Sequence, residues 1–271
     1  MSTEQPCIAF IGAGNMGEAM LRGLAASGQA KDRLRAHDIR EDRLKALALE
    51  AGFTAAESLA QALDGADIIV LATKPQAFGP LLAELGPLVR RSQTVVSIAA
   101  GVRLARLVEA LAPGTPLVRV MPNMPGLIGK GVSAYCLGPG AGDAHAAQAE
   151  SLLRPLGKVV RVREEDMDAV TALSGSGPAY VFAFMEALQS AGEGLGLGPE
   201  ATFLLASQTL AGAAAMIQAG GKSPSELRVA VTSPGGTTAA ALKVFEEAGF
   251  HALVARALTA ARDRSRELGK G

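Results

Sequence analysis

The residues best suited to binding a small anion form one short stretch, residues 232–238, with the sequence Thr-Ser-Pro-Gly-Gly-Thr-Thr. A predicted helix follows directly, so its first backbone N–H groups lack partners and carry partial positive charge. The stretch predicts a carboxylate site, although a capped loop between two helices has the same composition. Its glycines would admit a ligand close to the backbone, and its hydroxyls would donate and accept hydrogen bonds. The residues concerned are Ser233, Gly235, Gly236, Thr237 and Thr238.

A second stretch, residues 12–17, has the spacing Gly-x-Gly-x-x-Gly. It lies between an apolar run at 7–11, predicted to be a buried strand, and a helical pattern at 18–27. In that context the first glycine permits the tight turn, the second admits a pyrophosphate and the third allows close packing of helix on strand. The stretch therefore predicts dinucleotide binding by Gly12, Ala13, Gly14, Asn15, Met16 and Gly17.

The adenosine end of such a cofactor is predicted to lie beside Asp38. This acid ends the second strand-like run and follows Gly17 by about 20 residues, the spacing at which a carboxylate binds the ribose hydroxyls of NAD. Arg40 would instead pair with the 2′-phosphate of NADP, or would simply be solvated at a helix start. The choice between NADPH and NADH stays open.

Further cofactor contacts are predicted where other strands end, because open α/β sheets bind ligands at the carboxyl ends of their strands. Asn123, near two prolines, would orient a nicotinamide or a substrate, or would serve only as a rigid turn. The other candidates are Thr73, Lys74 and Pro75 after one strand and Ala99, Ala100 and Gly101 after the next.

Two kinds of periodicity divide the chain. Strand-like runs at 7–11, 34–37, 67–73, 94–98, 117–120, 132–136 and 159–162 alternate with helical segments. This alternation predicts an N-terminal Rossmann-type, doubly wound, mostly parallel sheet in residues 1–163. Only helical patterns follow, at 165–173, 178–195, 199–219, 223–231, 237–248 and 250–268. Residues 164–271 are therefore predicted to form an all-helical substrate-binding and dimerisation domain.

The segment 201–217 is apolar on nearly every side, so it must be buried all round. Six helices in one subunit offer too little cover for it. We therefore expect the helical domain to pack against a second copy in a homodimer.

Composition limits the classes of function. Lys plus Arg and Asp plus Glu number 26 each, and aromatic residues make up 4%, so no nucleic acid partner is expected. The polar start of the chain predicts no signal peptide, and no apolar run is judged long enough to span a membrane. Two cysteines in apolar surroundings suit a reducing compartment, and the scattered histidines predict no metal site. We expect a cytoplasmic protein.

Five segments together resemble pyrroline-5-carboxylate reductase along nearly the whole chain. They are Phe-Ile-Gly-Ala-Gly-Asn-Met-Gly at 10–17, Val-Ser-Ile-Ala-Ala-Gly at 96–101, Met-Pro-Asn at 121–123, Ser-Gly-Ser-Gly-Pro-Ala-Tyr at 174–180 and the stretch at 232–238. The resemblance implies reduction of the cyclic imine 1-pyrroline-5-carboxylate to proline by NADPH or NADH. It also implies a homodimer through the C-terminal helices, with a decamer of dimers as a larger assembly.

The resemblance implies roles for single residues as well. Backbone amides around 236–238 and the Ser233 hydroxyl would bind the imine carboxylate, and the Thr238 hydroxyl would bind the ring nitrogen. Glu164 falls where the family places an acid close to the substrate. Two residues depart from the pattern, since Met124 replaces a threonine and Ala230 occupies a position that is polar in some relatives.

Two other functions are compatible with part of this pattern. One is a related oxidoreductase acting on another cyclic imine or on a 3-hydroxy acid. A hydroxy-acid enzyme of this plan would carry a lysine on the helix beginning near residue 177, and none occurs through residue 195. The other is a scaffold that binds a nucleotide without turnover, which an intact carboxylate stretch argues against.

Overall fold

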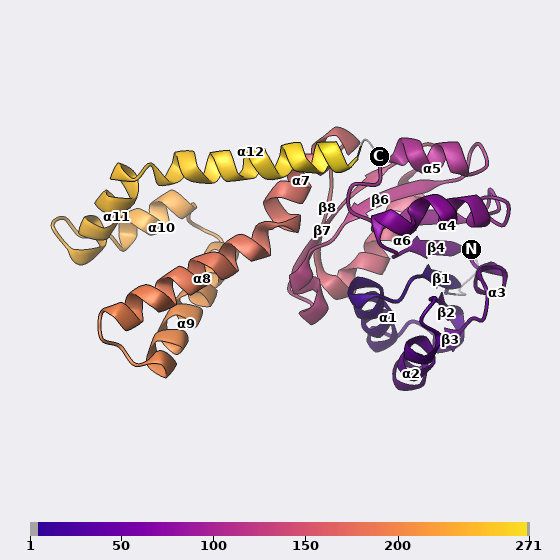
Figure 1. Cartoon of the computed structure of the whole chain (residues 1–271), viewed down its shortest axis with the longest axis horizontal. Helices are drawn as coiled ribbons and strands as arrows, with labels where there is room; N and C mark the ends of the chain where they lie inside the picture. The colour runs from indigo at the N-terminus through magenta and orange to yellow at the C-terminus, as the bar shows by residue number, and fades with distance from the viewer. Residues whose placement is uncertain (1–4, 270–271) are drawn as a thin grey trace. The chain divides into compact units, whose positions relative to one another are not determined.

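A computed structural model of the chain describes residues 5–269 and contains one eight-stranded sheet (Figure 1). The strand order is β3-β2-β1-β4-β5-β6-β7-β8, and neighbouring strands are parallel except for the antiparallel pair β6 and β7. The predicted doubly wound, mostly parallel sheet is confirmed. The strands are β1 (Ile8–Ile11), β2 (Leu34–His37), β3 (Thr54–Ala55), β4 (Ile68–Leu71), β5 (Thr94–Ser97), β6 (Leu117–Met121), β7 (Gly131–Leu137) and β8 (Gly157–Arg161).

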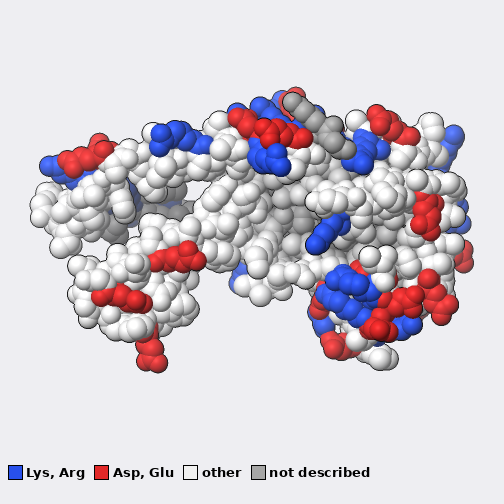
Figure 2. Space-filling view, in the orientation of Figure 1, with Lys and Arg blue, Asp and Glu red and all other residues white. Residues whose placement is uncertain are grey.

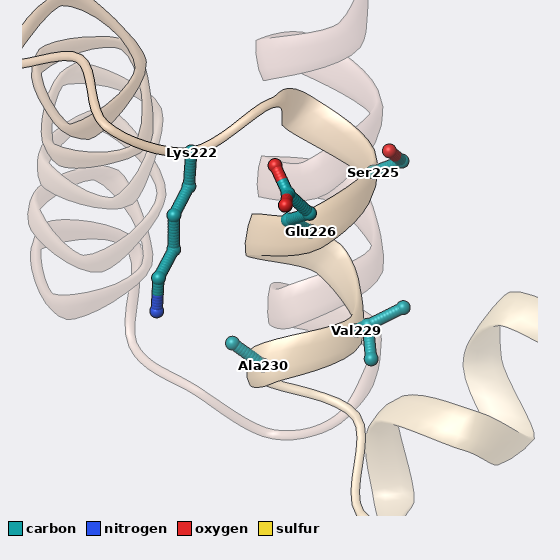
Figure 3. A pocket seen from close by; sticks show the side chains of 5 residues that line it. All are labelled: Lys222, Ser225, Glu226, Val229 and Ala230. Carbon is teal, nitrogen blue, oxygen red and sulfur yellow. The ribbon is translucent and has the colours of Figure 1, made fainter.

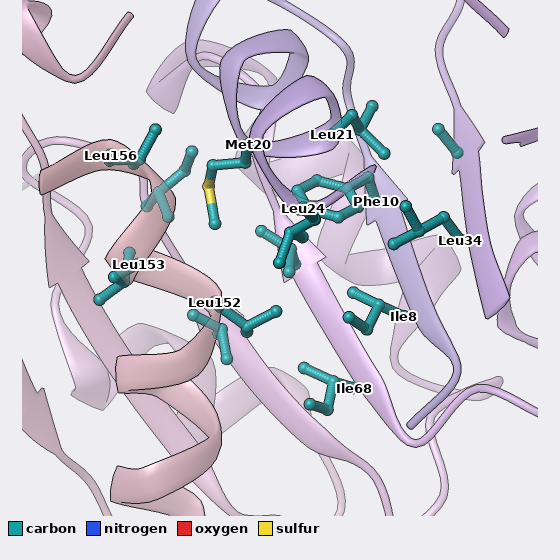
Figure 4. Packing of buried hydrophobic residues seen from close by; sticks show 14 of the residues in the cluster. Ile8, Phe10, Met20, Leu21, Leu24, Leu34, Ile68, Leu152, Leu153 and Leu156 are labelled. Atoms are coloured by element: carbon teal, nitrogen blue, oxygen red, sulfur yellow. The ribbon is translucent and has the colours of Figure 1, made fainter. Parts of the chain in front are cut away.

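Helices cover both faces of the sheet, which explains why β1, β4 and β5 are buried at every position. The core on one face joins α1, α2 and α6 to the strands, as Figure 4 shows for α1 and α6. The core on the other face joins α3, α4 and α5. These helices are α1 (Asn15–Ala26), α2 (Glu41–Ala51), α3 (Leu59–Leu63), α4 (Phe78–Leu85), α5 (Leu104–Ala110) and α6 (Asp143–Leu153).

Beyond β8 the described chain is helical, as predicted. A single-turn 3₁₀ helix, η5 (Glu164–Asp166), leads into α7 (Met167–Val170) and a π-helical turn, η6 (Thr171–Gly175). The π turn closes with a 2.8 Å hydrogen bond from the Ser176 N–H to the Thr171 carbonyl. The remaining helices are α8 (Gly177–Gly194), α9 (Pro199–Gln218), α10 (Pro224–Ala230), α11 (Thr237–Glu247) and α12 (Phe250–Leu268).

By its internal contacts the chain divides into two compact units. The first contains residues 1–176 and 261–271, and the second contains residues 177–260. The boundary between units thus lies after α7 and its π turn, whereas the sequence placed the domain boundary at residue 163. The end of α12 also returns to the first unit. Residues 1–4, part of the segment from which the absence of a signal peptide was predicted, lie outside the described residues.

Helix α9 presents its apolar side chains to solvent in the single chain. Thr202 is its one buried residue, and Figure 2 shows few charged side chains over α8 and α9 on the face in view. By length and composition alone α9 would be able to cross a membrane, contrary to the expectation that no segment is long enough. The helix was expected to be buried on all sides, and within one chain it is not.

Candidate active site

The predicted cofactor residues meet at one edge of the sheet. Ile11, at the end of β1, pairs with His37 of β2 and with Leu71 of β4, and Leu71 pairs with Ser97 of β5. The segments that follow these strands therefore emerge side by side. They begin at Gly12, Asp38, Ala72 and Ile98, at the point where strand order reverses around β1.

The three fingerprint glycines fit the roles predicted for them. Gly12 has φ +98°, and a Cβ there would lie 2.8 Å from the Ala72 carbonyl carbon. A Cβ on Gly17 would lie 2.6 Å from the Gly12 carbonyl oxygen, so the absence of a side chain lets α1 pack on the turn. Among the described residues, no heavy atom comes within 4 Å of the Cβ position of Gly14, the N-cap of α1. The helix start is open for a phosphate group.

Thr73 supplies independent support for a ligand at this edge. Its Oγ1 is buried and has no hydrogen-bond partner among the described residues. Buried hydroxyls are nearly always bonded, so this unpaired one, on a side chain next to Gly12, is available to a ligand at the turn. Lys74, the next residue, is exposed and precedes a 3₁₀ turn at Pro75–Ala77.

Asp38 is buried, and both its carboxylate oxygens are occupied. Oδ2 accepts the Ala13 N–H at 2.7 Å and Arg40 Nη2 at 3.1 Å, while Oδ1 accepts the Arg40 N–H at 2.9 Å and Arg40 Nε at 3.0 Å. Burial raises the pKa of Asp38, but the hydrogen bonds from Arg40 and Ala13 outweigh it and lower the pKa to about 2. A ribose hydroxyl would have to compete with Arg40 for this carboxylate.

Two arginines that the sequence analysis did not select support these segments. Arg43 donates to the Ala13 carbonyl and pairs with Glu18 at 2.6 Å, so α2 is tied to the fingerprint turn. Arg119 is buried in β6 and its Nη1 lies 3.3 Å from Glu164 Oε1. A charged residue inside an apolar strand pattern is the signal that would have pointed to Arg119.

Asn123 uses its side chain within the protein. Its Nδ2 donates to the Ser174 carbonyl at 3.2 Å, and its Oδ1 accepts the Val132 N–H at 2.9 Å. These bonds tie the end of β6 to β7 and to the π-helical turn. The geometry favours the rigid-turn interpretation, and direct contact with nicotinamide stays a prediction.

Glu164 is likewise engaged. Its Oε1 accepts the Leu104 N–H at 2.7 Å, besides Arg119. Leu104 is the first residue of α5, so the carboxylate caps the helix that follows the Ala99-Ala100-Gly101 loop. The Glu164 carboxylate is thus bonded to α5 and to β6, and its role near a substrate stays a prediction.

The predicted carboxylate stretch lies at the N-terminus of the 11-residue helix α11. The Gly236 N–H donates to the Ser233 carbonyl at 3.0 Å. The next three N–H groups, those of Thr237, Thr238 and Ala239, lie in the first turn of the helix and have no partner within it. Gly235 has φ +72°, which glycine adopts without strain. Among the described residues, no hydrogen bond engages the hydroxyls of Ser233, Thr237 or Thr238. This is the donor set that a small carboxylate requires.

Comparisons with known proteins identify the family of the chain. The family model "Pyrroline-5-carboxylate reductase dimerisation" matches residues 164–268, and "NADP oxidoreductase coenzyme F420-dependent" matches residues 7–101. The pyrroline-5-carboxylate reductase of Pseudomonas aeruginosa is 44% identical over 271 residues, covering 100% of this chain and 98% of that protein. The chain belongs to the pyrroline-5-carboxylate reductase family.

Solved structures of reductases show the same fold. That of a pyrroline-5-carboxylate reductase from Coxiella burnetii has a TM-score of 0.94 at 37% identity and covers 99% of this chain and 100% of its own. That of Plasmodium falciparum pyrroline carboxylate reductase, with NADP bound, has a TM-score of 0.87 at 30% identity and covers the same shares. The predicted family and fold are confirmed.

The two residues that depart from the reductase pattern lie on exposed surfaces of the described chain. Met124, 57% exposed, begins the 3₁₀ helix η3 (Met124–Ile128). Ala230 ends α10 and lines an open hollow of about 390 Å³, beside which the Lys222 side chain extends (Figure 3). This hollow contains none of the predicted site residues, and neither does one between α4 and α5.

Proposed function

We propose that the chain reduces 1-pyrroline-5-carboxylate to L-proline with NAD(P)H, the last step of proline biosynthesis. Reductases that match from end to end support this activity. The observation that carries it is the start of α11, where free amides and unbonded hydroxyls converge at 237–238. That donor set suits an imine that carries a carboxylate better than one that does not.

The carboxylate of the imine binds at α11. The N–H groups of Thr237 and Thr238 and the Ser233 hydroxyl donate to it, while Gly235 and Gly236 keep the approach free of side chains. The partial positive charge at the helix start favours an anion there. Binding at this end fixes the orientation of the ring.

The Thr238 hydroxyl holds the ring nitrogen. A protonated imine is already electrophilic, so the protein needs to position it rather than to activate it with a metal or a pair of carboxylates. When bound, the dihydronicotinamide supplies the hydride that the imine carbon accepts. Glu164 acts as a positioning residue through Leu104 and Arg119.

The coenzyme binds at the carboxyl edge of the sheet. Gly14, Asn15 and Met16, at the start of α1, would hold its pyrophosphate, and the unpaired Thr73 Oγ1 would donate a hydrogen bond to the coenzyme. Arg40, half exposed, would pair with the 2′-phosphate of NADPH in place of Asp38. Lys74, Pro75 and the Ala99-Ala100-Gly101 loop would hold the nicotinamide end.

Family models that match residues 7–101 and 164–268 support a division of the chain into two functional parts. Residues 1–163 bind NAD(P), and residues 164–271 bind the imine and form a homodimer, with a decamer of dimers as a larger assembly. A second copy covers the apolar side chains of α9. Buried free thiols at Cys7 and Cys136 suit a cytoplasmic protein, and no nucleic acid or membrane partner is proposed.

The test is oxidation of NADPH and of NADH by the purified protein with 1-pyrroline-5-carboxylate, followed by absorbance. We expect turnover with both, and the ratio of kcat/KM values reports whether Arg40 or Asp38 governs the adenosine end. A six-membered imine with NAD(P)H, and a 3-hydroxy acid with NAD(P)⁺, are assayed separately as alternative substrates. Coenzyme binding without turnover of 1-pyrroline-5-carboxylate would overturn the proposal.

A further inference from the structure

The last turns of α12 belong to the sheet unit rather than to the helical one. The helix is continuous from Phe250 to Leu268, yet the chain from Ala261 onward makes its contacts with residues 1–176. Ser265 is its one buried residue, 4% exposed. Figure 1 shows this end of α12 above α7.

A cluster around Asp168 of α7 binds the end of α12. The Ser265 hydroxyl donates to Asp168 Oδ1 at 2.7 Å. Arg103 Nη2 lies 3.6 Å and Arg266 Nε 4.0 Å from Oδ2 of the same carboxylate, which is 15% exposed. Charge-assisted bonds to a partly buried carboxylate are stronger than neutral ones, so the cluster ties α12 to α7 and to the residue before α5.

The residues after this contact lie directly on the loop that follows β5. Leu268 Cβ is 3.7 Å from the position that a Cβ on Gly101 would occupy. A Cβ on Gly269 would lie 3.0 Å from Arg103 Nε and 3.2 Å from the Gly101 carbonyl oxygen. The described end of the chain therefore packs closely on Gly101 and Arg103, and a side chain at 269 would push against both.

The same loop is held from its other end, because the Leu104 N–H donates to Glu164. The Ala99-Ala100-Gly101 loop is thus anchored by β5 at its start and by contacts at Gly101, Arg103 and Leu104 at its end. A loop fixed in this way loses less conformational entropy when a ligand binds.

We propose that the C-terminal end of α12 positions the coenzyme-binding loop, with Ser265 and Gly269 as its positioning residues. The inference rests on the proposed function, since it assigns that loop to NAD(P)H. Neither residue touches the coenzyme. Their effect is to hold Gly101 and Arg103 in the binding conformation before the coenzyme arrives.

The test uses Ser265→Ala, which removes the hydrogen bond to Asp168, and Gly269→Val, which introduces a side chain against Arg103. We expect the Kd for NADPH, measured by calorimetry, to rise about three- to thirtyfold in each, while the KM for the imine changes less than twofold. In the coenzyme-free protein, amide hydrogen exchange should accelerate at residues 98–104 and stay unchanged in β1 and β4.

Arg264→Ala is the matched control, because Arg264 lies on the same turn of α12 and, among residues 5–269, pairs only with exposed Glu267. Native Kd values in both positioning variants, or exchange that accelerates throughout the sheet unit, would overturn the inference. Gly269→Val, beyond the end of α12, keeps the test valid if Ser265→Ala does not fold. If the unaltered chain itself binds no NADPH, the proposed function fails instead.

Discussion

Thr238 stands at the second position of α11, where an unpaired N–H and an unbonded hydroxyl belong to the same half-buried residue. The hydroxyl is the group proposed to hold the ring nitrogen, so its removal leaves the imine free to rotate about its bound carboxylate. Thr238→Ala should lower kcat/KM by about ten- to a thousandfold, the range for one positioned polar contact. Steady-state kinetics at saturating NADPH measures this.

Thr238→Ser is the control for that variant, because it keeps the hydroxyl and loses only a methyl group. We expect it to retain most of the activity. If Thr238→Ala is as active as the unaltered chain, Thr238 has no part in the mechanism, and the carboxylate contacts alone position the imine.

The low pKa of Asp38 predicts that the free energy of unfolding falls in acid. Its pKa is about 2 in the folded chain, below its ordinary value, so the stabilising contribution is complete above about pH 4 and is lost as pH falls through about 2. The unaltered chain should lose about 2 kcal/mol of unfolding free energy relative to Asp38→Asn across that window. Urea unfolding at a series of pH values measures the difference, and parallel curves for the two proteins would refute it.

At the scale of elements, β7 and α6 are joined by a partly buried hydrogen bond. The Tyr135 hydroxyl, on a side chain 1% exposed, donates to Glu150 Oε1 at 2.7 Å. Burial and the neighbouring Glu150 carboxylate raise the pKa of Tyr135 to about 12, so the phenol stays a donor at all physiological pH values. The bond secures the one strand that runs antiparallel to its neighbour β6.

Tyr135→Phe should therefore lower the free energy of unfolding by about 1–3 kcal/mol, because it leaves the Glu150 carboxylate without its donor. Thermal unfolding followed by circular dichroism measures the loss. Glu150→Gln keeps an acceptor for the hydroxyl and should cost less than Tyr135→Phe. A larger loss of unfolding free energy in Glu150→Gln than in Tyr135→Phe would show that the carboxylate stabilises the fold through another interaction.

At the scale of the molecule, α9 leaves large apolar side chains in solvent. Phe203, Leu204 and Leu205 are 58%, 65% and 56% exposed in the single chain. An apolar surface of this kind on a helical unit that matches a dimerisation family marks a protein interface. A second copy of the chain is the proposed cover.

Phe203→Glu places a charge within that surface and should convert the dimer to a monomer, since an unpaired charge is costly to bury. Size-exclusion chromatography with light scattering gives the mass of each form. Glu200→Gln, in the exposed first turn of the same helix, should leave the mass unchanged. A dimer that survives Phe203→Glu would place the interface elsewhere.

Local patterns were enough to predict most of the elements. Buried parallel strands appear in the sequence as continuous apolar runs, and helices α9 and α12 begin at the predicted residues, Pro199 and Phe250. Glycine spacing predicted the Gly12 turn because only glycine adopts its positive φ without strain. The two-residue strand β3 and the π turn at Thr171–Gly175 were missed, since neither is long enough to produce a periodic pattern.

Only the tertiary structure determined which side chain bonds to or packs against which partner. Asn123 was selected for its chemistry and Glu164 for its place in the family resemblance, yet each is bonded to a segment far along the chain, at Ser174 and at Leu104. The packing of Gly269 on the Gly101 loop likewise joins residues that no local pattern relates. Local propensity acts over a few residues, whereas these contacts exist only once the sheet and the end of α12 have come together.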